Sequence, residues 1–300
     1  MFLSIHRVSQ GALRPATYTC AMPELPEVET VRRGLESRLI DATVADVVVR
    51  DRRLRWPIAA DFEAQLRGRK IVAVERRSKY LLFRLAGDEK STLLAHLGMT
   101  GSFVVHPADS PLAHKPHDHV DVLLTGRQAS LVLRYNDPRR FGSMHHFSGL
   151  DAEQPLLAHL GPEPLTDALT GEYLYEQTRR RTVAIKQALM DNTLVVGVGN
   201  IYANESLFRA GIHPDRAANR VSLARYKRLV LEVKTVLTEA IAAGGSTLRD
   251  FVNTAGEPGY FQLDYFVYGR DGQPCKVCGT PLKLMRHGGR ATVFCRACQR

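Results

Sequence analysis

The stretch from Met22 to Thr30 (MPELPEVET) holds the residues of this chain best suited to covalent chemistry. If Met22 is removed, Pro23 becomes the first residue and carries a free secondary amine. A terminal amine has a pKa of about 7.7–8.0, against about 10.4 for a lysine, so more of it is uncharged near neutrality. Such amines form Schiff bases with carbonyl carbons, and Glu24 supplies a carboxyl group for proton transfer. Taken alone, these nine residues favour a simpler interpretation, in which prolines and acidic side chains open a helix.

Four of the five cysteines form two pairs near the C-terminus, Cys275-x2-Cys278 and Cys295-x2-Cys298, with sixteen residues (279–294) between them. This spacing is typical of a structural zinc ribbon. Four thiolates fill a tetrahedral shell and leave no open position, so we expect one structural Zn²⁺ ion. Redox activity is the alternative, and the closeness of the two pairs favours the metal. A hairpin this small has little core and would need the zinc to fold.

A glycine-rich turn, VVGVGNIY at 195–202, leads into a helical pattern. A lone G-x-G is weak evidence for a nucleotide site, and no βαβ unit precedes it. A tight glycine turn before a helix can still direct backbone N–H groups at a phosphate. Lys186 and the arginines at 179–181 add positive charge nearby, although a solvated helix end is the simpler explanation for that cluster.

Composition limits the class of protein. The chain has 300 residues, of which 44% are hydrophobic, and a formal net charge of +10 with a pI near 9.6. The length suggests two domains, and the positive charge indicates a polyanionic partner, most simply nucleic acid. No run of about 18 apolar residues is present, so we expect no membrane span. The cysteine spacing argues against a disulfide-stapled secreted protein and favours the cytoplasm.

Hydrophobic periodicity predicts a strand-rich N-terminal part. From Leu25, apolar residues recur at helical spacing, which predicts one helix. Eight strands separated by Gly, Asp and Pro follow, at 43–50, 71–74, 80–85, 92–96, 102–106, 120–124, 130–135 and 142–147. So many short strands after one helix indicate a β-sandwich or barrel.

The C-terminal part is predicted to be helical. Prolines and glycines at 151–164 indicate a linker. Shorter helices are expected at 166–178, 183–191, 204–210 and 246–252. A long amphipathic helix is expected from Leu223 to Ile241, between Ser222 as its cap and the glycines at 244–245. The tail from Asp264 is expected to form two hairpins.

Motifs along the chain resemble those of the bacterial formamidopyrimidine-DNA glycosylases, base-excision enzymes that remove oxidised purines. They run in the family's order from Met22 to Arg300: MPELPEVET, Lys79 in RRSKYLL, HLGMTGS at 96–102, KPHDHVD at 115–121, YNDPRRFG at 135–142, LGPEPL at 160–165, DNTLVVGVGNIYANESLFRAGIHP at 191–214, then GYF…YGR…PC and the four-cysteine ribbon. The resemblance implies an α+β multidomain fold, with an N-terminal helix and β-sandwich, a helix–two-turn–helix domain and a C-terminal zinc ribbon. The expected ranges are an extension at 1–21, a catalytic domain at 22–150, a linker at 151–165, a DNA-binding domain at 166–260 and the ribbon at 261–300.

The resemblance also implies roles for particular residues. Pro23 is the expected nucleophile, Glu24 a proton-transfer group and Glu27 a supporting carboxylate. Lys79 is the expected proton donor during strand cleavage, and Arg290 is expected to grip the lesion phosphate. The expected DNA contacts are Met99, Phe141 and Arg139, which would fill the space left by the extracted base, together with His117, Arg181 and Asn200. Without the resemblance, Met99 and Phe141 would be assigned to the core, and Lys79 and Arg290 to the surface.

The sequence therefore predicts a monomeric DNA glycosylase and abasic-site lyase that excises oxidised purines from duplex DNA, with zinc as its one cofactor. An endonuclease VIII-type enzyme for oxidised pyrimidines is the near alternative, and the ELPEVET opening and the segment 253–268 favour the purine enzyme. Residues 1–21 do not fit the family pattern. We interpret them as a mis-assigned start or a removed segment, because a retained extension makes the Pro23 nitrogen an amide. In that case a non-catalytic damaged-DNA-binding protein is the alternative.

Overall fold

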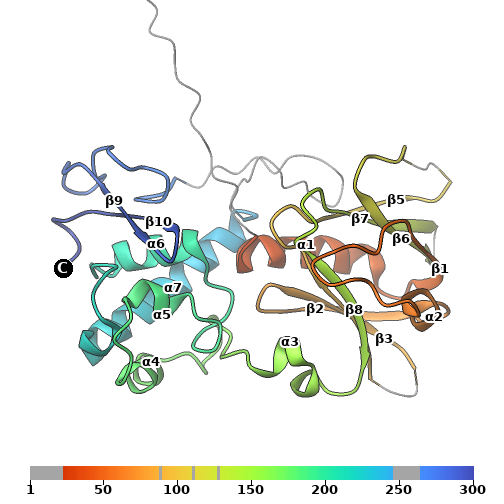
Figure 1. Cartoon of the computed structure of the whole chain (residues 1–300), viewed down its shortest axis with the longest axis horizontal. Helices are drawn as coiled ribbons and strands as arrows, with labels where there is room; N and C mark the ends of the chain where they lie inside the picture. Colours follow the sequence, from red (N-terminus) through yellow and green to blue (C-terminus); the bar gives the residue numbers. More distant parts are fainter. Residues whose placement is uncertain (1–22, 88–89, 110–111, 127–128, 246–263) are drawn as a thin grey trace, which may run out of the picture.

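The computed structural model describes residues 23–87, 90–109, 112–126, 129–245 and 264–300. Strands β1 (Thr43–Val49) to β8 (Ser143–Ser148) lie on one side of the molecule. Helices α4 (Gly171–Thr178) to α7 (Leu223–Ala242) lie on the other, with the hairpin of β9 and β10 at 283–294 (Figure 1). Helix α1 (Leu25–Leu39) packs against β2 (Ile71–Arg77) of the first group and α7 of the second, and so lies between them. Within the described ranges, no helix is long and apolar enough to cross a membrane.

Helix α1 (Leu25–Leu39) forms where the apolar spacing predicts it. Its buried side chains include Leu25, Val28, Val31, Leu35 and Leu39. Glu24 caps its N-terminus, and a capping box joins Glu24 and Glu27, which satisfies backbone N–H groups that the first turn leaves unpaired. The acidic residues of the opening motif are therefore part of the helix start.

The strands form the two antiparallel sheets of a sandwich. One sheet has the order β1-β6-β7-β5 and the other β2-β3-β4-β8. Their bounds are Thr43–Val49 (β1), Ile71–Arg77 (β2), Tyr80–Leu85 (β3), Ser91–His96 (β4), Ser102–Pro107 (β5), Asp118–Thr125 (β6), Ser130–Asn136 (β7) and Ser143–Ser148 (β8). All eight predicted strands are present. Sequence reasoning missed the short helix α2 (Phe62–Leu66), which buries only Phe62 and Leu66 and so offers no repeating pattern.

The helical part begins inside the predicted linker, which contains η1 (Asp151–Glu153) and α3 (Pro155–Ala158). The remaining helices are α4 (Gly171–Thr178), α5 (Ile185–Leu189), α6 (Asn200–Arg209), η2 (Ala218–Arg220) and α7 (Leu223–Ala242). The prediction for α4 started too early, because Thr170 caps the helix by accepting a hydrogen bond from the Tyr173 N–H. The prediction for α6 started too late, because its first turn directly follows the glycine turn. The predicted helix at 246–252 lies outside the described residues.

The zinc-ribbon part contains a single strand hairpin, β9 (Lys283–His287) and β10 (Arg290–Phe294). The sequence predicted two hairpins, and the other is reduced to an isolated bridge between Pro274 and Pro281. A small cluster that includes Phe208, Val267 and Leu282 joins this part to α6. Few apolar residues are available here, which agrees with a need for metal.

Two loops of the sandwich are held together by one buried carboxylate. Asp137 accepts hydrogen bonds from the Gly142 N–H at 2.8 Å, the Thr100 hydroxyl at 2.6 Å and the Tyr135 hydroxyl at 3.3 Å. The loop at 97–101 and the loop at 137–142 therefore form one unit. Gly142 leaves the room that this packing requires.

We expect Gly142→Ala to destabilise the protein by about 1–3 kcal/mol, the usual cost of overpacking. An added Cβ would lie 1.9 Å from the Tyr135 hydroxyl oxygen and 2.6 Å from the His96 carbonyl oxygen. Urea unfolding measures this cost. In a Tyr135→Phe background the nearer clash is gone, so the same substitution should cost less. An equal cost in both backgrounds would contradict this explanation.

Candidate active site

The N-terminus of α1 meets the N-terminus of α6 at the Glu24 carboxylate. Its oxygens accept hydrogen bonds from the N–H groups of Gly199 at 2.8 Å and Ile201 at 2.9 Å. Glu27, one turn along α1, accepts from the Glu24 N–H at 2.9 Å and from the Tyr202 hydroxyl at 2.7 Å. Both carboxylates are buried. Pro23 directly precedes this contact.

The glycine turn is required by this close approach. A Cβ on Gly199 would lie 2.3 Å from the Glu24 side-chain carbon Cδ. Gly197 has a φ of +79°, and its carbonyl accepts a hydrogen bond from the Leu25 N–H at 3.1 Å. The two glycines thus let α6 point its free N–H groups at a carboxylate of the protein itself. The motif that indicated a phosphate site binds an internal anion at these groups.

Burial raises the pKa of Glu24 to about 7. The positive charge of Lys79 opposes this shift, and the neighbouring Glu27 adds to it. The pKa of Lys79 is lowered, also mainly by burial, with Glu24 and Glu27 opposing and Arg290 contributing. These mutual effects bring Glu24, Glu27, Lys79 and Arg290 into one electrostatic group. Perturbed acid and base groups of this kind mark functional sites.

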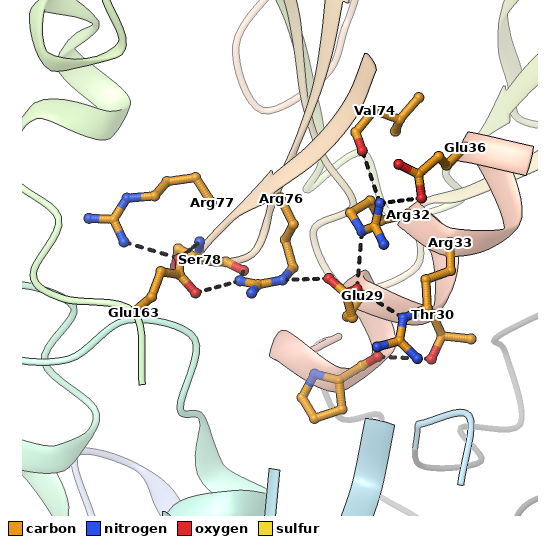
Figure 2. Close-up of polar contacts among 11 residues, drawn as sticks. Glu29, Thr30, Arg32, Arg33, Glu36, Val74, Arg76, Arg77, Ser78 and Glu163 are labelled. Carbon is orange, nitrogen blue, oxygen red and sulfur yellow. Dashed lines mark hydrogen bonds and ion pairs between the residues drawn. The ribbon is translucent and has the colours of Figure 1, made fainter. Parts of the chain in front are cut away.

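Lys79 lies in the two-residue turn between β2 and β3, and Glu163 from the linker holds that turn (Figure 2). The Glu163 carboxylate accepts hydrogen bonds from the Ser78 N–H at 2.6 Å, from Arg76 at 2.8 Å and from Arg77 at 3.0 Å. Ser78 has a φ of +57°, a conformation that is uncommon for a residue with a side chain. The carboxylate therefore stabilises a strained turn directly before Lys79.

The Glu163 contact extends onto α1. Arg76 also donates to Glu29 at 3.1 Å, and Glu29 in turn pairs with Arg32 and Arg33 (Figure 2). Sequence reasoning assigned no role to Glu163. The available signal was its position in LGPEPL, a motif matched to the family without a function.

Lys186 is a second buried lysine at the site. Its ammonium group donates to the side-chain oxygen of Asn200 at 2.7 Å, the Ala291 carbonyl at 2.9 Å and the Thr292 hydroxyl at 2.7 Å. Burial lowers its pKa to about 7, with Glu24 opposing and Arg290 adding to the effect. The sequence indicated only a nearby positive charge. Lys186 instead joins the first residue of α6 to strand β10.

Arg290 is the first residue of β10 and is exposed. Its charge lowers the pKa of both buried lysines, so the ribbon brings this arginine to the site although Glu24 lies near the other end of the chain. Asn200 lies at the start of α6 with its side-chain oxygen occupied by Lys186. The fold thus assembles residues that are almost the whole chain apart.

The predicted intercalating residues lie on the two loops that Asp137 joins. Phe141 is 44% exposed, and the Arg139 guanidinium lies 4.8 Å from its ring centre. Met99 is partly buried in the neighbouring loop. An interpretation of Phe141 as core is therefore wrong, and its exposed ring is available to a partner.

The other two predicted DNA contacts differ in their environment. His117 is exposed and has a φ of +73°. Arg181 is partly exposed and forms an ion pair with Asp191 at 2.6 Å, which offsets part of its charge. His117 is thus the more accessible of the two to a ligand.

The four paired cysteines form one cluster. Their sulfur atoms lie within 4.8 Å of one another, with Cys278–Cys295 at 3.5 Å and Cys275–Cys298 at 4.0 Å. Zn–S bonds of about 2.3 Å in a tetrahedron place sulfurs roughly 3.8 Å apart. The residues therefore fit one Zn²⁺ with a complete protein shell, and the ion would hold the base of the ribbon.

The structure combines a β-sandwich, a helix that follows a glycine turn, and a ribbon with four clustered cysteines. This combination defines a zinc-containing enzyme of the helix–two-turn–helix class. Three family models match the chain. They are the formamidopyrimidine-DNA glycosylase N-terminal domain at 22–144, the H2TH domain of the same enzymes at 160–252 and the zinc finger found in FPG and IleRS at 272–300. The chain belongs to the formamidopyrimidine-DNA glycosylase family and is a DNA repair glycosylase.

Relatives and solved structures agree with this assignment. The chain is 55% identical over 280 residues to the formamidopyrimidine-DNA glycosylase of Pseudomonas entomophila, covering 93% of this chain and all of that protein. It matches the MutM (Fpg) structure from Thermus thermophilus with a TM-score of 0.80 and 40% identity, over 92% and 98% of the two chains. It also matches Lactococcus lactis Fpg in complex with abasic-site DNA, with a TM-score of 0.81 and 32% identity, over 92% and 99%.

The raised pKa of Glu24 predicts a pH-dependent stability. Between its ordinary value of 4.5 and about 7, the folded state holds a proton that the unfolded state has lost. The stabilisation is therefore complete below pH 4.5 and is lost as the pH rises through 7, with an upper bound of about 3 kcal/mol. The unfolding free energy of the wild type minus that of Glu24→Gln should fall across this range. A difference that stays constant would contradict the raised pKa.

Removal of the metal should unfold the ribbon and thereby disturb the site. Lys186 relies on Ala291 and Thr292 of β10 for two of its three acceptors, so unfolding the ribbon leaves a buried ammonium poorly paired. We expect the unfolding temperature and the activity to fall as the zinc content falls. A brief exposure to chelator that removes no zinc should change neither. Cys278→Ser should lower zinc content, whereas the control Val277→Ser, at an exposed side chain between the first two cysteines, should not. Full activity in metal-free protein would contradict this.

Proposed function

We propose that this protein is a bifunctional glycosylase and abasic-site lyase that removes oxidised purines, such as 8-oxoguanine and formamidopyrimidines, from duplex DNA. The observation that carries the proposal is the position of Pro23. It directly precedes Glu24, whose carboxylate lies between two helix N-termini and interacts electrostatically with the buried Lys79. A potential nucleophile (Pro23), a titratable acid (Glu24) and a lysine of lowered pKa (Lys79) thus belong to one site.

In the first step, the Pro23 secondary amine attacks C1′ of the deoxyribose, and the bond from C1′ to the damaged base breaks. The amine proton passes to the departing base. The bond from C1′ to the ring oxygen then breaks as that oxygen takes a second proton from Glu24, which leaves an iminium ion between the proline nitrogen and C1′. Glu24 suits this proton transfer, because a pKa of about 7 populates both of its protonation states near neutrality. Glu27 supports the site by accepting the hydroxyl of Tyr202.

In the second step, the iminium makes the C2′ proton acidic, so a base removes it and the 3′ phosphate leaves. A further elimination then releases the 5′ phosphate. Lys79 is the group we assign to proton transfer here, since its lowered pKa makes proton release easier than for an ordinary lysine. Arg290 is assigned to the lesion phosphate and to the second elimination, because it is an exposed guanidinium beside both buried lysines.

Damaged duplex DNA is the proposed partner. The extracted base leaves a gap whose cost is roughly a few kcal/mol of lost stacking. The exposed Phe141 ring, with Arg139 and Met99, is suited to fill it. His117, Asn200 and Arg181 are assigned to the DNA backbone. A solved relative, Lactococcus lactis Fpg, is described in complex with DNA containing Fapy-dG, which favours oxidised purines over the pyrimidines of the alternative.

The decisive experiment compares the 300-residue chain with the chain expressed from Met22, on a duplex carrying 8-oxoguanine opposite cytosine, with borohydride present. We expect the shorter form to lose Met22 and to give a covalent adduct on Pro23. Without borohydride it should leave a one-nucleotide gap with phosphate at both ends. The longer form should give no adduct, because its Pro23 nitrogen is an amide.

Three outcomes separate the alternatives. An intact abasic product from the shorter form would contradict the lyase. Faster cleavage of a thymine-glycol duplex than of the 8-oxoguanine duplex would favour the pyrimidine enzyme. If the protein from its native gene retains Met1 and gives no adduct, the non-catalytic DNA-binding alternative is supported.

A further inference from the structure

The turn that carries Arg290 depends on two glycines and one histidine. Gly288 and Gly289 join β9 to β10 with φ values of +53° and +77°. An added Cβ on Gly289 would meet nothing within 4 Å, so backbone conformation and not space requires glycine there. His287 and Arg290 pair directly across this turn. The place where His287 is held therefore sets the place of Arg290.

His287 is held on both sides of its ring. Nε2 lies 2.9 Å from an Asp215 carboxylate oxygen, and Nδ1 lies 3.0 Å from the Thr292 hydroxyl. Asp215 belongs to the loop between α6 and η2 in the helical domain, whereas Thr292 belongs to β10. The imidazole thus links the ribbon to the helical domain, and its side chain is only 10% exposed.

The chemistry of the groups decides which of them donates and which accepts in each of these hydrogen bonds. The Lys186 ammonium has only hydrogens to donate, so the Thr292 oxygen accepts from it. The Thr292 hydroxyl hydrogen is then available to Nδ1 of His287, which leaves Nε2 to donate to Asp215. An imidazole with a hydrogen on Nε2 satisfies every group, and cooperative series of hydrogen bonds of this kind strengthen their members.

The series of contacts from Asp215 to Thr292 ends at Lys186, which also contacts the loop that carries Asp215. The Lys186 backbone N–H donates to the Pro214 carbonyl at 3.2 Å, directly before Asp215. Asp215, His287, Thr292 and Lys186 therefore form a ring of contacts through two elements of the helical domain and both strands of the ribbon. Replacing any of these four residues removes hydrogen bonds that fix the position of the turn carrying Arg290.

We propose that His287 is a positioning residue for the cleavage chemistry, which holds Arg290 and the Lys186 ammonium in place through Asp215 and Thr292. His287 itself need not touch the DNA. The inference rests on the proposed function, because it takes the role of Arg290 in the second elimination from there. It predicts an effect on one step of the reaction and not a general loss of fold.

The test uses the zinc-loaded protein in whichever form, full length or starting at Met22, gives the borohydride adduct. His287→Ala and Asp215→Ala are compared with the control Glu172→Ala, which breaks an exposed ion pair between α4 and Lys227 of α7. On an abasic-site duplex we expect both test variants to slow the second elimination roughly tenfold relative to the first, about the effect of one charge-assisted hydrogen bond. The control should keep the wild-type ratio of once-cut to twice-cut product.

A double-mutant cycle shows whether His287 acts through Arg290. If it does, adding His287→Ala to Arg290→Ala should change the second elimination less than twofold, because the two changes are not additive. A tenfold loss in both backgrounds would overturn the proposal. So would wild-type product ratios in Asp215→Ala, or a loss confined to zinc content and unfolding temperature. If the wild type gives no adduct, the proposed function fails instead, which keeps the two failures distinct.

Discussion

The structure depends on one carboxylate that caps two helices at once. Glu24 begins α1 and also accepts N–H groups from the start of α6, which lies about 175 residues later in the chain. Each helix N-terminus attracts negative charge, so one buried anion stabilises both. The cost of burying that anion is visible in its raised pKa. The same contact brings the sandwich, the helical domain and the start of the family motif together, so the site and the domain arrangement share one cause.

The cationic side chains near the site fall into two groups, which differ in their partners and in their burial. The guanidinium groups of Arg76 and Arg77 both pair with Glu163, and Arg76 also pairs with Glu29, so these cations have structural partners. Lys79 and Lys186 lie in a group where burial outweighs the attraction of Glu24, so their ammonium forms are weakened. Arg290, by contrast, is exposed. A net charge of +10 therefore says little about which cations face DNA, since the protein uses several of them internally.

Local patterns predicted the elements but not their meeting points. Strand-like segments between Gly, Asp and Pro breaks were enough to predict the eight strands, and the five apolar positions from Leu25 predicted α1. The cysteine spacing predicted the metal cluster. The contact between Glu24 and Gly199, and that between Lys186 and Thr292, join segments far apart in the chain, where no spacing rule applies. The family resemblance supplied candidate roles for Lys79 and Arg290, but not for Glu163, Lys186 or His287.

The attachment of Glu163 has a mechanical consequence. Glu163 belongs to the segment between the domains, yet it holds the Ser78 N–H in the turn before Lys79, and Arg76 continues the contact to α1 (Figure 2). Any change in the path of this segment would therefore act directly on the turn that carries Lys79. The segment between the domains is thus a brace for that turn as well as a connection.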